Sequence, residues 1–336
     1  MMRYKARDQW WTTHPYRARA NISAVVLRND PQAHQKFKRV FEYTKNYGEP
    51  AVIWVDSTEV AYNPCVEIGM CPTLIRDPSG EVLENYSRDI LNPQNRDRYR
   101  EQGYTFETAF QFCNLCEINM SAWESVEDAE RAVYFATVLG CIQASYTGTE
   151  GDYLSKTATR AILERESLLG VSLTGIATAP EWARAPELLR RLAYIATSTA
   201  SEYWERCGLQ SVPARVTCVK PSGNASVNLG CSSGIHPEHA RKYVRRVQVP
   251  RSSPIVQAFA TANPLAVESC LWTSADDVTL AFAIEAPEGA LTRDKQSARE
   301  FLDQVRLVQE NWVYHGTNRH DSVEGLTHNV SNTCTV

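Results

Sequence analysis

The stretch NPCVEIGM, from Asn63 to Met70, follows the apolar segment AVIWV (51–55) and places an amide, a thiol and a carboxylate at alternate positions. In an extended segment, residues i, i+2 and i+4 project to the same side. We therefore expect the side chains of Asn63, Cys65 and Glu67 to converge on one face of a short strand or loop. The AVIWV segment itself is typical of a buried strand that leads into this motif.

A carboxylate beside a thiol restricts the chemistry of the motif. The negative charge raises the thiol pKa and so disfavours a thiolate nucleophile, and the motif contains no histidine that would activate one. A thiol used as a radical needs no ionisation, so a neighbouring carboxylate is tolerated and can serve as a general base. The structural alternative is an inert cysteine, buried in the turn that follows a strand.

Helical and strand-like patterns alternate around the motif. Helices are expected at 31–47 (ending at Gly48), from Ser121 with Glu124 completing a capping box, and at 156–168, 186–207, 237–247 and 293–315. Strands are expected at 171–177, 214–219, 278–284 and 328–336. This alternation predicts an α/β fold with a mostly parallel sheet, whose chemistry lies in the loops after the strands. The segment 72–107 is rich in charged and turn residues, which predicts a polar surface insertion.

The bulk composition excludes some classes of protein. The 336 residues carry a net charge of -4, which argues against a nucleic-acid or membrane-surface protein. No run of apolar residues is long enough for a transmembrane helix and the start lacks a signal-peptide core, so we expect a cytoplasmic protein. In that compartment, redox, metal or catalytic use is expected for a few of the ten cysteines. Buried structural roles are expected for Cys141, Cys207, Cys218 and Cys270.

The segment FCNLCEIN contains a C-x-x-C pair, Cys113 and Cys116, which is typical of half a zinc site or of a redox pair. A second C-x-x-C is absent, but His236 and His239 in HPEH could complete a Cys₂His₂ site. The alternative function is therefore a non-catalytic zinc-binding or scaffold protein. Capping or packing roles for the two histidines are the favoured interpretation.

A small, hydroxyl-rich loop follows the expected strand at 214–219. Its residues are Pro221, Ser222, Gly223, Asn224, Ala225 and Ser226. Such a loop can present several backbone N–H groups and hydroxyls to a phosphate. It lacks the G-K-[ST] element of a Walker A loop, and an ordinary glycine- and serine-containing turn is the alternative.

Taken together and in this order, the motifs resemble the large catalytic subunit of ribonucleotide reductases, most closely the adenosylcobalamin-dependent class. The resemblance is carried by RANISAV (19–25), NPCVEIGM, QFCNLCEIN, RESLLGVSLTGIA (165–177), RVTCVKPSGNASVNLGCSSGIHPEHARKYVRRVQ and GLTHNVSNTCTV (325–336). It implies the second half of a ten-stranded α/β barrel, with a central finger loop at about 62–70 that carries the catalytic cysteine.

The resemblance also implies roles for individual residues. Cys65 would be the thiyl radical that abstracts the 3′ hydrogen of a ribonucleoside di- or triphosphate, and Glu67 would take the 3′-hydroxyl proton. Asn63 would bind the substrate hydroxyls, Cys113 would be one of two reducing thiols, and the loop 221–226 would hold the phosphates. Adenosylcobalamin would generate the radical. Cys116 is expected to be a spectator, because residues i and i+3 of a strand face opposite sides.

Other family elements have no counterpart in the sequence. These are most of the first half-barrel with its reducing cysteine, the last barrel strand and the C-terminal cysteine tail. We therefore expect the chain to act as the C-terminal part of a split or truncated catalytic subunit, inactive alone. Its partners would be a separately encoded N-terminal half and an external dithiol of the thioredoxin type. An inactive reductase fragment is the remaining alternative.

Overall fold

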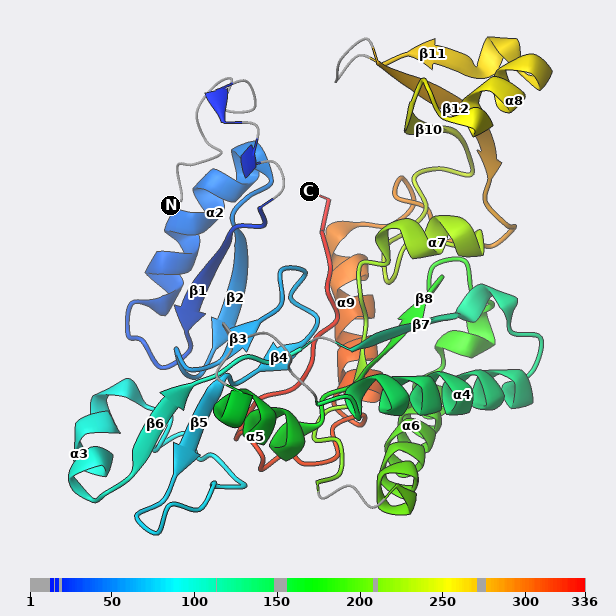
Figure 1. Cartoon of the computed structure of the whole chain (residues 1–336). Helices are drawn as coiled ribbons and strands as arrows, with labels where there is room; N and C mark the ends of the chain where they lie inside the picture. Colours follow the sequence, from blue (N-terminus) through cyan, green and yellow to red (C-terminus); the bar gives the residue numbers. More distant parts are fainter. Residues whose placement is uncertain are drawn as a thin grey trace.

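The computed structural model describes residues 13–14, 16–17, 20–112, 114–147, 156–207, 211–270 and 276–335. The fold is mixed α/β, as predicted (Figure 1). The strands are β1 (Ser23–Leu27), β2 (Ala51–Val55), β3 (Ala61–Tyr62), β4 (Gly69–Met70), β5 (Thr73–Arg76), β6 (Thr105–Thr108), β7 (Leu115–Asn119), β8 (Gly170–Thr174), β9 (Thr217–Cys218), β10 (Lys242–Pro250), β11 (Val267–Ser269) and β12 (Asp277–Glu285). Across the described ranges they form five separate sheets and no closed barrel. Two of these sheets are parallel and three are antiparallel, so the prediction of a mostly parallel sheet is wrong.

The α-helices surround these sheets. They are α2 (Ala33–Tyr47), α3 (Arg96–Glu101), α4 (Val126–Ala144), α5 (Lys156–Glu166), α6 (Pro186–Arg206), α7 (Gly223–Leu229), α8 (Pro254–Ala262) and α9 (Ala298–Val308). A π-helical turn, Gln309–Val313, continues α9. No helix in the described part of the chain is both long and apolar enough to span a membrane.

The parallel sheet β7–β8–β9 has two chemically different faces. Its register pairs Glu117 with Ser172 and Ser172 with Cys218, so these three side chains project to one side. The opposite side chains, among them Leu173, are buried in the main hydrophobic core with residues of α4, α6 and α9. The indole of Trp312, fully buried, donates from Nε1 to the carbonyl of Cys218 at 2.9 Å and so links the π-helical turn after α9 to β9.

A β–α–β unit precedes the cysteine motif. β1 and β2 pair in parallel, and α2 ends where Gly48 adopts the left-handed conformation, with φ 72°. The helix predicted at 31–47 and the strand at 51–55 are therefore confirmed, but the strand is not the buried one expected, since only Val55 of its five residues is buried. β2 leads into the antiparallel pair β3–β4, which encloses the motif.

The segment 72–107, expected to be a polar surface insertion, contributes buried side chains instead. It contains β5 and β6, which pair with each other, and Leu74 and Ile75 on β5 are buried. Tyr86 is fully buried in a cluster with Val323 from near the end of the chain. The turns of this segment are polar, but its apolar residues form part of the interior.

The helix predicted at 237–247 is wrong, because residues 242–250 form strand β10, which pairs antiparallel with β12. The run KYVRRVQVP contains Val244, Val247 and Val249, and β-branched side chains favour an extended chain. In Figure 1, the antiparallel sheet β10–β12–β11 projects with α8 away from the sheet β7–β8. The strand predicted at 328–336 reduces to one parallel bridge between Val219 and Val330.

Two finer predictions need correction. Helix α4 begins at Val126, because Ser125 accepts the cap hydrogen bond from the Asp128 backbone, while Ser121 lies in a preceding 3₁₀ turn. The expectation of buried structural cysteines holds for Cys141 and Cys218. It is wrong for Cys207, which is exposed, and Cys270 is half-buried.

Candidate active site

The β3–β4 hairpin shapes the NPCVEIGM motif as a tight loop. The carbonyl of Asn63 accepts from the Val66 backbone at 2.9 Å, and its side-chain Oδ1 accepts from the Ile68 backbone at 2.9 Å. Val66 has φ 72°, a left-handed conformation that is unfavourable for a β-branched residue. The strained turn is therefore fixed by Asn63, which serves the loop as well as the site.

The loop is also held by segments far away in the sequence. Asn21 donates from its side chain to the Pro64 carbonyl at 2.8 Å. Asn329 donates from its backbone to the Glu67 carbonyl at 2.8 Å and from its side chain to the Val66 carbonyl at 3.0 Å. The N-terminal strand region and the C-terminal segment thus clamp the two sides of the loop.

His328 clamps the base of the same loop. Its Nδ1 accepts from the Gly69 backbone at 3.1 Å, so the ring proton is on Nε2, which lies 2.7 Å from the Leu169 carbonyl. Burial and the nearby Arg215 charge lower the pKa of His328 to about 3, so the ring is neutral. A Cβ at position 69 would clash with the Thr327 carbonyl, which explains the glycine. Sequence reasoning did not identify His328.

Glu67 and Cys65 lie close enough to influence each other electrostatically. Glu67 is only 1% exposed, and no hydrogen-bond partner of its Oε2 is found among the described residues. Burial raises the pKa of Glu67, while a hydrogen bond with Asn63 and the Lys220 charge oppose the rise. Burial and the Glu67 charge raise the pKa of the half-buried Cys65 thiol. The loop therefore brings the three predicted side chains together and keeps the thiol protonated.

A second carboxylate and a lysine belong to the same cluster. Glu117 Oε1 lies 3.8 Å from Lys220 Nζ, and Glu117 Oε2 accepts from the Ser222 hydroxyl at 3.2 Å. Burial raises the pKa of Glu117, Lys220 lowers it and the Glu67 charge raises it further. The Lys220 charge therefore lowers the pKa of both Glu67 and Glu117. Glu117 follows Cys116 and Lys220 precedes Pro221, so the predicted motifs contained both residues without singling them out.

The predicted phosphate loop lies at the start of α7. Ser222 is the residue before the helix and has φ 68°. Ser222 Oγ is bonded to Glu117, and Ser226 Oγ donates to the Gly223 carbonyl at 3.1 Å. The serine hydroxyls are thus engaged within the protein. The first backbone N–H groups of a helix lack intrahelical acceptors, so they are the groups that could meet an anion here.

The predicted thiol pair is described only in part. Cys113 lies outside the described residues. Cys116 Sγ lies 3.6 Å from Gln143 Oε1 of α4 and packs against the helical core, on the opposite face of β7 from Glu117. This placement agrees with a spectator role for Cys116.

Of the two histidines in the zinc alternative, His236 already has partners within the protein. His236 Nδ1 lies 2.9 Å from the Ser233 carbonyl, and its Nε2 accepts from the Thr333 backbone at 2.9 Å. Both ring nitrogens are therefore engaged. Within the ranges that the structure describes, no group of three or more His, Cys, Asp or Glu residues is placed to hold a metal ion.

Comparison with known proteins identifies relatives of one class. A putative adenosylcobalamin-dependent ribonucleoside-triphosphate reductase of Mycobacterium phage D29 is 27% identical over 259 residues, which cover 72% of this chain and 31% of that protein. The adenosylcobalamin-dependent ribonucleoside-triphosphate reductase of Euglena gracilis is 29% identical over 109 residues, covering 32% of this chain and 14% of that protein. No family model matches the chain.

The fold has a similar counterpart among solved structures. The crystal structure of a B12-dependent (class II) ribonucleotide reductase superposes with a TM-score of 0.62 at 17% identity, over 93% of this chain and 43% of that one. The resemblance predicted from the motifs is thus confirmed. The chain spans less than a third of the length of the phage relative and less than half of the solved structure.

Proposed function

We propose that this chain contributes the radical cysteine and the phosphate-binding loop of a ribonucleotide reductase active site. That site converts ribonucleotides to 2′-deoxyribonucleotides. The observation that carries the proposal is the pairing of Cys65 with Glu67. A protonated, half-exposed thiol lies beside a buried acid that has an unpaired oxygen and a raised pKa. That combination suits hydrogen-atom transfer with a general base, and it suits a thiolate nucleophile poorly.

Cys65, Glu67 and Asn63 would each have a separate role in the reaction at the ribose. The Cys65 thiyl radical takes the hydrogen atom from C3′, and the Glu67 carboxylate takes the proton of the 3′-hydroxyl. Asn63 Oδ1 is bonded to the Ile68 backbone and the side chain also hydrogen-bonds with Glu67, so we assign the remaining amide N–H to the substrate hydroxyls. Because burial raises the pKa of Glu67, the carboxylate is a stronger base than an exposed glutamate.

Loss of the 2′-hydroxyl as water requires two electrons and two protons, which a pair of thiols supplies as it is oxidised to a disulfide. We assign one thiol to Cys113. The second would come from a separately encoded N-terminal half, and an external dithiol of the thioredoxin type would reduce the disulfide again. Adenosylcobalamin, when bound, would supply the radical that removes the hydrogen atom of Cys65. A half-exposed, neutral S–H group fits that cofactor.

The substrate phosphates would lie at the start of α7, within residues 221–226. Backbone N–H groups of the first turn would bind the di- or triphosphate, since the Ser222 and Ser226 hydroxyls are engaged elsewhere. The Lys220 ammonium at the adjoining strand end adds positive charge. Under the same proposal, the chain is the second half of the reductase barrel. The loop between β3 and β4 is then the finger loop.

The experiment combines this chain with an N-terminal reductase half, adenosylcobalamin, a dithiol and a ribonucleoside triphosphate, and measures deoxynucleotide formation. The chain alone should be inactive and the mixture active. Cys65→Ala should abolish the product, whereas Cys207→Ala, which removes an exposed thiol elsewhere, should leave it unchanged. Activity in the Cys65→Ala mixture would reject the assignment.

A further inference from the structure

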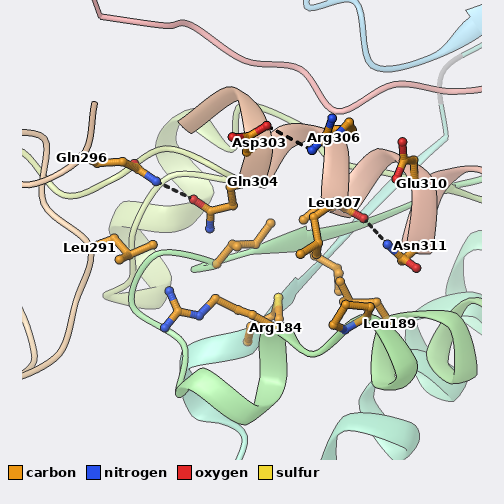
Figure 2. A pocket seen from close by; sticks show the side chains of 15 residues that line it. Arg184, Leu189, Leu291, Gln296, Asp303, Gln304, Arg306, Leu307, Glu310 and Asn311 are labelled. Carbon is orange, nitrogen blue, oxygen red and sulfur yellow. Dashed lines mark hydrogen bonds and ion pairs between the residues drawn. The ribbon is translucent and has the colours of Figure 1, made fainter. Parts of the chain in front are cut away.

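A cavity of about 640 Å³ lies on the helical side of the parallel sheet, between the start of α6, helix α9 and the loop before α9 (Figure 2). We call it the α6–α9 cavity. It is separate from the candidate active site, because its floor includes Leu173, whose neighbour Ser172 projects to the opposite face of β8. On that opposite face, Ser172 Oγ accepts from the Lys220 backbone at 2.8 Å.

The floor of the α6–α9 cavity is apolar. Met120, Leu173, Ile176 and Leu189 are buried, and Leu307 of α9 closes one side. Pockets that bind small organic molecules typically have volumes of about 300–1,000 Å³, apolar walls and a few convergent polar groups. The size and the walls of this cavity meet that description.

One end of the cavity carries an incompletely satisfied pair of amides. Gln296 Nε2 donates to Gln304 Oε1 at 2.9 Å. The other two amide atoms, Gln296 Oε1 and Gln304 Nε2, are buried and have no partner among the described residues. The pair therefore offers one acceptor and one donor, and buried polar groups of this kind are normally satisfied by a partner.

A cation lies at the same end. In Figure 2, Arg184 extends toward the end where Gln296, Gln304 and Leu291 lie, away from Leu189 and Asn311. Arg184 is half-buried, and burial lowers its pKa, with the Glu181 charge opposing the change. Within the part of the chain that the structure describes, no carboxylate lies within ion-pair distance of Arg184.

The acidic side chains of the lining do not neutralise Arg184. Asp303 forms an ion pair with Arg306 at 3.1 Å, and both are exposed at the rim together with Glu310. A guanidinium without a carboxylate partner, partly withdrawn from water, is suited to binding an anion by charge-assisted hydrogen bonds.

We propose that the α6–α9 cavity binds a small organic anion, an aromatic or aliphatic carboxylate or sulfonate with a largely apolar body. Arg184 binds the anionic group, and the leucines, Ile176 and Met120 contact the apolar body. The free amide atoms of Gln296 and Gln304 bind an N–H or carbonyl group near the anion. The site is independent of the proposed reductase chemistry, so binding at it can be tested on the chain alone.

Two fluorescent probes test the proposal. Anilinonaphthalene sulfonate has an apolar body, an N–H group and an anionic group, and N-phenylnaphthylamine has the same body without the anion. Arg184→Gln should weaken binding of the sulfonate roughly tenfold or more, since a charge-assisted hydrogen bond is lost, and should leave binding of the neutral probe unchanged. Arg206→Gln, at the exposed C-terminal end of α6, should affect neither probe.

A substitution that fills the cavity provides a second test of the proposal. Leu307→Trp places an indole in the space and should abolish binding of both probes, with circular dichroism showing that the variant is folded. Equal sulfonate affinity in the wild type and in Arg184→Gln would overturn the proposal. Undiminished binding of both probes to a folded Leu307→Trp variant would also overturn it. If the tryptophan variant does not fold, the Arg184 comparison decides alone.

Discussion

Two glutamates of this molecule are equally buried and have opposite electrostatic properties. Glu67 is 1% exposed and Glu166 is 0% exposed. Burial tends to raise the pKa of Glu166, but Arg215, Arg165 at 3.2 Å and Gln111 at 2.8 Å reverse the effect and lower it. Glu67 has no comparable partners, so its pKa is raised. Burial alone therefore does not distinguish the two acids. The arginine partners of Glu166 do, and Glu67 is the acid that we propose as the general base.

The ion-paired Glu166 helps to hold the loop that carries Glu67. Arg215, which is bonded to Glu166, also donates from Nε to the Gly69 carbonyl at 3.2 Å, at the end of the cysteine loop. Arg165 stacks on the ring of Tyr86, with 3.9 Å between its guanidinium carbon and the ring centroid. The ionic cluster thus forms a rigid base for the loop. Strain at Val66 and the unpaired oxygen of Glu67 are tolerated because this base holds the loop in place.

The largest effect of any substitution is expected for Glu67→Gln, on catalytic activity. Glu67→Gln keeps the shape of the side chain and removes the base, so the reconstituted enzyme should lose about 10²–10⁴-fold in kcat, the usual contribution of a general base. The variant should unfold at a denaturant concentration close to that of the wild type, because a neutral amide tolerates burial at least as well as an unpaired carboxylate. Near-wild-type turnover would remove Glu67 from the mechanism.

Glu166→Gln should have the converse effect, on stability. It leaves the buried guanidinium groups of Arg165 and Arg215 without their counter-charge, which typically costs about 3–5 kcal/mol in the free energy of unfolding. Urea unfolding at neutral pH measures this loss. Because the pKa of Glu166 is lowered, its contribution to stability is present above the pKa of an unfolded glutamate and is lost as the pH falls through the folded value. A loss no larger than that of Glu67→Gln would contradict the comparison.

The same contrast explains how far the sequence could predict the structure. Cys65 and Glu67 were predicted to lie together as positions i and i+2 of an extended segment. The segment is a tight turn instead, and the two side chains still lie close because both belong to one short hairpin loop, which is a local property. The clamp on Gly69 comes from His328, 259 positions away, and Arg215 is 49 positions from Glu166. Such partners are brought together by the tertiary fold, so no local pattern indicates them.

The incorrect helix at 237–247 has a similar cause. Its basic residues would suit the solvated face of a helix, but the same side chains are equally compatible with an exposed antiparallel strand. The partner that determines the outcome is β12, whose residue Glu285 pairs with Lys242 across the sheet. Where the pattern is local and strong, as at α2 with Gly48, the prediction was correct.

The smallest effect is expected at Lys220, whose charge lowers the pKa of the Cys65 thiol against burial and the Glu67 charge. Lys220→Met removes that cation, so the thiol pKa should rise and alkylation of Cys65 should begin at higher pH. Glu67→Gln removes the neighbouring negative charge, so the thiol pKa should fall and alkylation should begin at lower pH. The pH dependence of the iodoacetamide reaction, followed by mass spectrometry of the peptide that contains Cys65, measures both without requiring activity.

Opposite shifts from these two variants would place Cys65 between a cation and an acid. Lys242→Met, on the exposed strand β10, should leave the titration unchanged, and so should Glu166→Gln if that variant remains folded. Shifts in the same direction, or a shift in Glu166→Gln as large as that in Glu67→Gln, would mean that the thiol does not distinguish the two buried acids. Glu67 would then be a structural residue like Glu166. Separate responses at the thiol therefore test directly whether Glu67, whose pKa is raised, belongs to the chemistry and Glu166, whose pKa its arginines lower, to the scaffold.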